Sequence, residues 1–147
     1  MTRDEISYTV KNMGQLLDPA LVYIAEMENV PVAMIVALPD LNEALYGLGG
    51  KLLPFNWAKL IWRLKVKGLQ GARVLLMGAL PEFQGGFTGS AIATLLICRL
   101  HEALRRAGYQ GAELSWVLED NVAVNRLVEA VGGRRYKTYR IFEKDLA

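Results

Sequence analysis

Glycine and hydroxyl residues gather between residues 80 and 96, LPEFQGGFTGSAIATLL, in a pattern that could bind a phosphate. An apolar strand ends at Leu80, and an apolar helical run follows the glycines. Glycine lets the backbone approach an anion closely, and the first turn of a helix offers unpaired N–H groups with a partial positive charge. The candidate binding residues are Gln84, Gly85, Gly86, Phe87, Thr88, Gly89 and Ser90. An ordinary capped turn between strand and helix would have a similar composition, and this alternative stays open.

Two common phosphate-binding motifs do not fit this loop. A Walker A loop needs GxxxxGK[ST], and no lysine stands between Gln84 and Ser90. A dinucleotide fingerprint needs GxGxxG, with an acidic residue at the end of the next strand. Here the glycines have a different spacing, and the acidic residue at a comparable distance, Glu113, would begin its strand. Neither class of nucleotide-binding site is predicted.

Length and composition indicate a folded α/β protein. The chain has 147 residues, of which 52% are hydrophobic and 22% charged, enough for a core and too apolar for a disordered chain. Its net charge of +2 does not argue for a nucleic-acid or membrane partner. The single cysteine, Cys98, is expected in the core, and the single histidine, His101, on a solvated helix, so we predict no metal site. No signal peptide or spanning stretch is recognised, which predicts a cytoplasmic location.

Hydrophobic periodicity predicts one α/β domain with a mixed sheet over residues 1–147. The predicted helices are 4–16, 57–67, 89–107 and 122–131, and the predicted strands are 21–27, 31–38, 72–80, 112–118 and 134–143. The first two strands should form a hairpin around Glu28 and Asn29. Asn56 is expected to cap one helix, and Asp120 or Asn121 another. The stretch 39–71 is an insertion between the hairpin and the next strand.

An ordered run of motifs between residues 18 and 145 resembles the GCN5-related N-acetyltransferase (GNAT) superfamily. The turn ALPEF at 79–83 resembles its strand-ending turn. Gln84 and Gly89 take the first and last places of its Arg/Gln-x-x-Gly-x-Gly/Ala segment, and LEDN at 118–121 ends the next strand. The hairpin and the stretches AELSWVLEDN and YKTYRIFEK look like a group of bacterial members without an established substrate.

The resemblance implies the acyl-CoA N-acyltransferase fold without its first strand, because only one helix fits ahead of the hairpin. An open, apolar sheet edge invites pairing with another chain. Together with a mean hydropathy of +0.19, this edge predicts a homodimer.

The same resemblance implies a binding site for acetyl-CoA or another acyl-CoA where strands 72–80 and 112–118 separate near Gly78. The pantetheine arm would pair with the backbone of Ala79 and Leu80, and an N–H of Gly78 or Ala79 would polarise the thioester carbonyl. The diphosphate would rest on the amides of residues 84–90. Asn121 would hydrogen-bond the pantetheine arm.

Two departures from the superfamily pattern affect the chemistry. Phe87 replaces a central glycine of the loop, and Val128 stands where many members have the tyrosine that protonates the departing thiolate. The candidate bases are Glu82, Ser115, Glu119 and Asp120, with Tyr136 and Tyr139 as candidate replacements for the missing acid. The catalytic residues therefore stay unknown.

The resulting prediction is an acyl-CoA-dependent N-acyltransferase for an unknown small amine, whose pocket residues 39–71 help to form. The alternative is a degenerate, non-catalytic member that binds CoA or a protein partner.

Overall fold

A computed structural model describes residues 18–50, 53, 55–114, 116–140 and 142–143. The chain divides into two compact units, Met1–Trp116 and Val117–Ala147, and each is described by itself. The predicted helix 4–16 lies outside the described residues, and the single domain over 1–147 stays a prediction.

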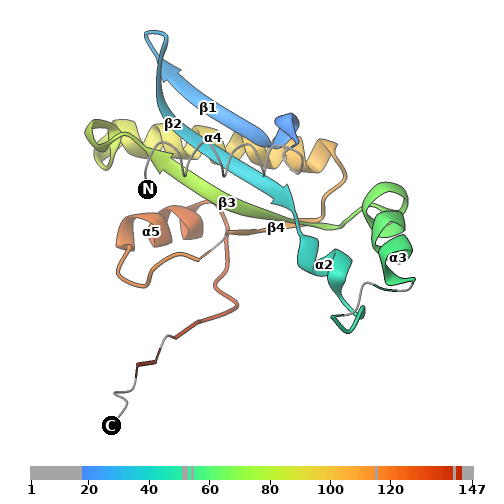
Figure 1. Cartoon of the computed structure of the whole chain (residues 1–147). Helices are drawn as coiled ribbons and strands as arrows, with labels where there is room; N and C mark the ends of the chain where they lie inside the picture. The colour runs from blue at the N-terminus through green and yellow to red at the C-terminus, as the bar shows by residue number, and fades with distance from the viewer. Residues whose placement is uncertain (1–17, 51–52, 54, 115, 141, 144–147) are drawn as a thin grey trace. The chain divides into compact units, whose positions relative to one another are not determined.

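A four-stranded sheet in the order β1-β2-β3-β4 forms the centre of the first unit (Figure 1). The strands are β1 (Val22–Met27), β2 (Val30–Pro39), β3 (Gly71–Ala79) and β4 (Gly111–Leu114). Neighbours pair antiparallel except β3 and β4, which are parallel. The predicted hairpin is confirmed: Glu28 and Asn29 have φ of 51° and 65°, the left-handed values that a two-residue hairpin turn requires. The predicted mixed α/β sheet is confirmed as well.

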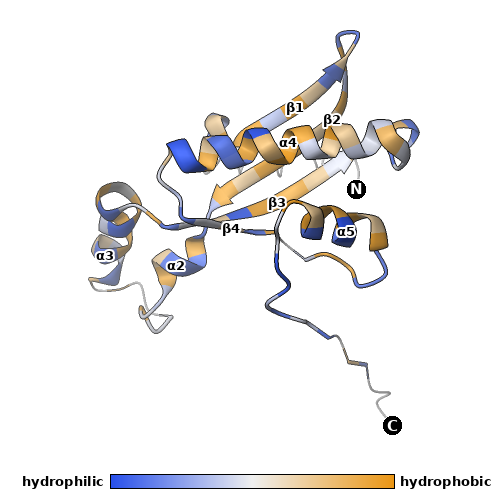
Figure 2. Cartoon of the chain, turned by 180° about the vertical axis from the view of Figure 1, so that it is seen from behind, coloured by the Kyte–Doolittle hydropathy of each residue, from blue (hydrophilic) through white to orange (hydrophobic). Residues whose placement is uncertain are grey.

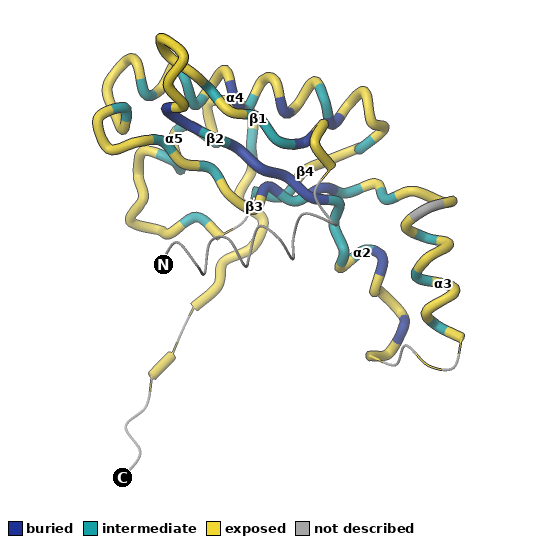
Figure 3. Tube along the Cα trace, turned by 45° about the horizontal axis from the view of Figure 1, so that its top comes forward, coloured by how far each residue is buried: buried dark blue, intermediate teal, exposed yellow. Residues whose placement is uncertain are grey.

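Helix α4 (Gly86–Arg106) covers one face of this sheet (Figure 2). Its buried leucines, Leu96, Leu100 and Leu104, recur every four residues and therefore share one side of the helix. They form one core with Ile35 of β2 and Val74 of β3, among other residues. The continuous apolar run of β2 is buried through most of its length (Figure 3), as expected for a strand that is covered on both faces.

Several short elements complete the structure. They are η1 (Pro19–Leu21), α2 (Leu41–Leu45), α3 (Asn56–Trp62), its π-helical continuation η2 (Arg63–Lys67), η3 (Pro81–Phe83) and, in the second unit, α5 (Val122–Ala130). Asn121 caps α5 by accepting a hydrogen bond from the Val124 N–H at 3.3 Å, as predicted. Within the described residues, no helix is both long and apolar enough to cross a bilayer.

The largest differences between the observed elements and the sequence prediction are at three places. Helix α4 starts at Gly86 instead of residue 89, and β4 ends at Leu114 instead of residue 118. The described part of 134–143 forms no strand. Alternating residues predict a half-buried surface, but a strand forms only where a neighbouring strand supplies hydrogen-bond partners.

Two single residues also differ from their predicted places. Cys98 is exposed, because it lies two positions from both Leu96 and Leu100 and so on the other side of α4. Asn56 is the first residue of α3 rather than its cap, and its side-chain amide donates to the Leu48 carbonyl at 3.2 Å. His101 is exposed on α4, as predicted.

Tyr109, just after α4, provides a pH-dependent contribution to stability. Burial against the core raises the pKa of its phenol, and the negative charge of Asp18 raises it further. A raised pKa means that the folded state favours the neutral phenol, so this contribution is present below about pH 10 and is lost as the pH rises through the folded-state pKa. We expect stability in urea to fall above pH 10, and Tyr109→Phe to make that fall shallower. If stability fell equally steeply with pH in the unmodified chain and in Tyr109→Phe, Tyr109 would not be the source of this pH dependence.

Candidate functional site

The end of β3 that leads into the glycine loop has an open edge. The parallel register of β3 with β4 ends at the pair Val74 and Leu114. Strand β3 continues through residues 75–79, of which 76–79 pair with β2 alone among the described strands. Leu75, Leu76 and Gly78 in this stretch are exposed. A strand edge of this kind presents backbone N–H and C=O groups to a ligand that can pair with it.

The hydrogen bond of Leu80 shows which backbone groups face this open edge. The Leu80 N–H donates to the Val32 carbonyl of β2 at 2.8 Å. Residues along a strand alternate in the edge to which their N–H and C=O point. Gly78 therefore points its backbone groups toward β2, as Leu80 does, and Met77 and Ala79 point theirs toward the open edge. Of the two N–H groups predicted to polarise a thioester, the geometry favours that of Ala79. The sequence analysis did not name Met77, whose backbone groups face the same open edge.

The glycine loop turns the chain through left-handed backbone conformations. Gly85 and Gly86 have φ of 77° and 62°, values that residues with a Cβ rarely adopt. Phe87 is not among the residues with positive φ: it lies in the first turn of α4, with its side chain 91% exposed. Phe87 therefore causes no backbone strain here, because Gly86 takes the unusual conformation.

Gly89 and Gln84 hold the loop against the strand end. A Cβ atom added to Gly89 would overlap the backbone oxygen of Phe83, so the first turn of α4 and η3 are as close as glycine allows. The Gln84 side-chain amide donates to the Ala79 carbonyl at 2.8 Å. Both contacts fix the start of α4 relative to the open end of β3.

The side chains of the loop and its sequence neighbours supply no positive charge for binding an anion. The Ser90 hydroxyl donates to the Gly86 carbonyl at 2.8 Å, so it lies along the helix. The N-cap, Gly85, has no side chain to satisfy the first amides of α4, and Thr88 is exposed beside them. No lysine or arginine occurs between Val74 and Cys98. A diphosphate at this loop would depend on helix N–H groups and their dipole.

An ion pair fixes the strand pair below the open edge. Arg73 and Glu113 are direct neighbours in the parallel register of β3 and β4, and their side chains meet at 2.8 Å. Both side chains are largely removed from solvent. The pair therefore stabilises the register at the end of β3 where it is paired with β4.

The second unit contains the other predicted binding residue, Asn121. The Oδ1 atom of Asn121 holds the cap of α5, and Asn125 donates to the carbonyls of Leu118 and Asn121 at 3.0 Å each. Val128 lies in α5 and supplies no proton donor.

The candidate acid and base residues belong to both units of the chain. Glu82 is exposed in η3, and Glu119, Asp120, Tyr136 and Tyr139 are exposed in the second unit. Ser115 lies outside the described residues. In the part of the chain that the structure describes, no three His, Cys, Asp or Glu residues gather as metal ligands.

Two curated proteins match almost the whole chain. Protein YghO of Escherichia coli and the bacterial ceramide synthase of Caulobacter vibrioides are each 43% identical to it over 145 residues, or 99% of the chain. The chain spans 37% and 38% of the length of these relatives. No family model matches the chain.

Solved structures show the fold. The structure of AAC(6')-Iy in complex with the bisubstrate analog CoA-S-monomethyl-acetylneamine superimposes with a TM-score of 0.62 at 14% identity, covering 99% of this chain and 82% of that one. The chain therefore has the fold of the GNAT superfamily, which its motifs predicted.

Proposed function

We propose that the chain is an acyl-CoA-dependent N-acyltransferase domain. The observation that carries this proposal is the open edge of β3 at Met77 and Ala79, leading directly into a glycine loop and an uncapped helix N-terminus. An extended pantetheine arm can pair with the open edge of β3, and a diphosphate can accept hydrogen bonds from the N–H groups at the start of α4. The fold supports the same reading, because AAC(6')-Iy, which shares it, is bound to a CoA analog.

In this proposal each part of the site has a role in acyl transfer. The acceptor nitrogen attacks the thioester carbon, its C–N bond forms as the C–S bond breaks, and CoA leaves as a thiolate. The Ala79 N–H stabilises the negative charge on the carbonyl oxygen. The diphosphate lies on the amides of residues 84–90, and Asn121 contacts the pantetheine arm through its Nδ2 group. The proton acceptor is one of Glu82, Ser115, Glu119 and Asp120.

The name of one relative suggests the class of acceptor. A ceramide is the amide of a long-chain amino alcohol, so a ceramide synthase that uses acyl-CoA would be an N-acyltransferase of the same class. We therefore propose a long-chain amine as an acceptor to compare with the small amine that the sequence suggested. We also propose a cytoplasmic location, where acyl-CoA is present, and a homodimer through the sheet edge.

A melting curve with and without acetyl-CoA is the first test. A ligand at a hundred times its dissociation constant stabilises a protein by about 2.7 kcal/mol, which raises Tm by several degrees. We expect this shift, and release of free CoA thiol when an amine is added. Small and long-chain amines, each with acetyl-CoA and a long-chain acyl-CoA, form the substrate panel.

The outcomes of this test separate the proposed activity from its alternative. A shift in Tm without thiol release from any pair of substrates would favour a degenerate domain that binds CoA. No shift with either acyl-CoA would contradict the binding site itself and would favour a domain that binds only a protein partner.

A further inference from the structure

The insertion between β2 and β3 is anchored to the rest of the first unit on one side. Glu43 of α2 accepts hydrogen bonds from the backbone N–H groups of Gln70 and Gly71, each at 2.9 Å to its Oε2 atom. Arg63 of η2 donates to the carbonyls of Ala44 and Tyr46 at 2.7 and 2.6 Å. Helix α3 and η2 are therefore held against α2 by their polar side.

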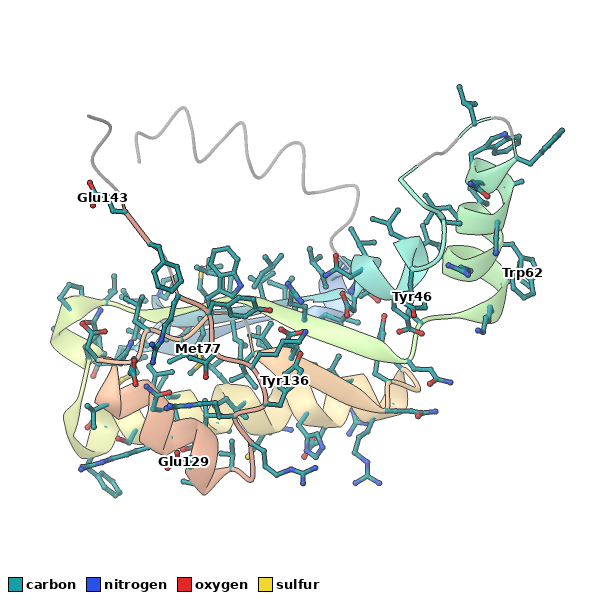
Figure 4. The ribbon with its side chains drawn as sticks, turned by 90° about the horizontal axis from the view of Figure 1, so that it is seen from below. Tyr46, Trp62, Met77, Glu129, Tyr136 and Glu143 are labelled. Atoms are coloured by element: carbon teal, nitrogen blue, oxygen red, sulfur yellow. The ribbon has the colours of Figure 1, made fainter. Side chains whose placement is uncertain are left out.

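The opposite side of α3 and η2 exposes large apolar side chains. Trp57 and Ile61 are four residues apart, as are Trp62 and Val66, so they form two neighbouring rows on the helix surface. Phe55, just before α3, is 80% exposed, and Val66 is 69% exposed. Trp57 and Trp62 are each 51% exposed. Figure 4 shows Trp62 extending away from α2. We call Phe55, Trp57, Ile61, Trp62 and Val66 the α3 face.

The segment that carries the α3 face has charge of a single sign. Residues 46–71 contain five basic residues and no Asp or Glu. The five are Lys51, Lys59, Arg63, Lys65 and Lys67. The rest of the chain has 12 basic and 15 acidic residues, a net charge of −3. Residues 46–71 contribute +5, so the whole chain has a net charge of +2. The nearly neutral total conceals a segment that is strongly basic.

We propose that the α3 face binds the surface of an anionic lipid bilayer, with the helix lying in the plane of the membrane. Tryptophan side chains favour the region of the lipid headgroups, and lysines of the same segment, such as the exposed Lys59 and Lys67, are attracted to anionic lipids. Cores of protein–protein interfaces are also rich in tryptophan but are depleted of lysine. The five positive charges of residues 46–71, with no acidic residue among them, therefore favour an anionic lipid surface over a protein partner. This binding is independent of acyl transfer, and it would place the chain where long-chain amines are dissolved.

Sedimentation with vesicles tests the proposal on the whole chain. We expect binding in 0.15 M salt to vesicles that contain 30% phosphatidylglycerol in phosphatidylcholine, and at least about tenfold weaker binding to pure phosphatidylcholine. The double variant Lys59→Glu and Lys67→Glu should lose at least about tenfold in partitioning to the anionic vesicles. The matched control is Arg134→Glu with Arg135→Glu, which changes the net charge equally at exposed positions of the second unit and should bind like the unmodified chain.

The tryptophans provide a second, independent readout. Trp57→Ser with Trp62→Ser should abolish vesicle binding, whereas Trp116→Ser, which removes an exposed tryptophan outside the insertion, should leave it unchanged. Circular dichroism establishes that each variant is folded. Equal binding to neutral and anionic vesicles, no binding to either, or equal losses in the controls would overturn the proposal. So would a dimer that Trp57→Ser with Trp62→Ser converts to monomers, because a second copy would then cover the α3 face.

Discussion

Replacing Gly89 with valine is expected to remove measurable binding of acetyl-CoA. The new Cβ atom would overlap the Phe83 carbonyl oxygen, so the first turn of α4 must move away from η3. That movement separates the helix N–H groups from the open edge of β3, and a diphosphate and a pantetheine arm could no longer use both at once. Isothermal titration should show a dissociation constant at least about a hundredfold higher, and acetyl-CoA should no longer raise Tm.

Gly111→Val is the matched control for this variant. A Cβ atom at Gly111 would meet no heavy atom within 4 Å, and β4 is an extended strand that accepts a β-branched residue. The control should bind acetyl-CoA normally. Gly89→Val itself should stay folded, because overpacking typically costs about 1–3 kcal/mol and the strain is confined to one turn. If folded Gly89→Val bound acetyl-CoA as tightly as the unmodified chain, the loop would not be the binding site.

The parts of the fold that depend on local sequence were predictable. The two-residue turn at Glu28 and Asn29 is flanked by apolar strands, and the leucines of α4 recur with the helical period. The glycine loop was recognised from its composition, and the structure explains two of its residues: Gly86 supplies the left-handed backbone, and Gly89 the close approach to Phe83.

The open edge of β3 was harder to predict because it depends on pairing between distant strands. The backbone groups of Met77 and Ala79 face that edge only because Leu80 pairs with Val32, and the register with β2 shifts between Val36 and Ala37. The shift leaves Leu75 without a partner in the register. No periodicity in the sequence records such a bulge, although it changes which residues a ligand can reach.

The exposed aromatic residues of α3 show a different limit. Helical spacing places Trp57 and Ile61 on one side of the helix, and the usual inference is that this side is buried. In the structure no residue of α3 is buried, and the hydrogen bonds of Arg63 turn the other side toward α2. A periodic pattern locates a face of a helix but does not say what covers it.

Replacing Glu43 with alanine is expected to release the insertion and lower stability by about 2–3 kcal/mol. The Glu43 carboxylate accepts from the Gln70 and Gly71 N–H groups just where β3 begins, and alanine would leave both donors without this partner. A charge-assisted hydrogen bond of this kind contributes more than one between neutral groups. Urea unfolding should show the loss of stability, and hydrogen exchange should show faster opening of Gln70 and Gly71.

Glu43→Gln separates the effect of charge from that of shape. Glutamine retains one carbonyl oxygen in nearly the same place, so it should recover part of the stability that alanine loses. Glu129→Ala is the matched control, since Glu129 is exposed on α5 and should change stability by less than about 0.5 kcal/mol. If Glu43→Ala were as stable as the control, the carboxylate would not anchor the insertion. Arg63 ties η2 to α2, and Glu43 ties α2 to the start of β3, the strand that leads into the glycine loop at its other end.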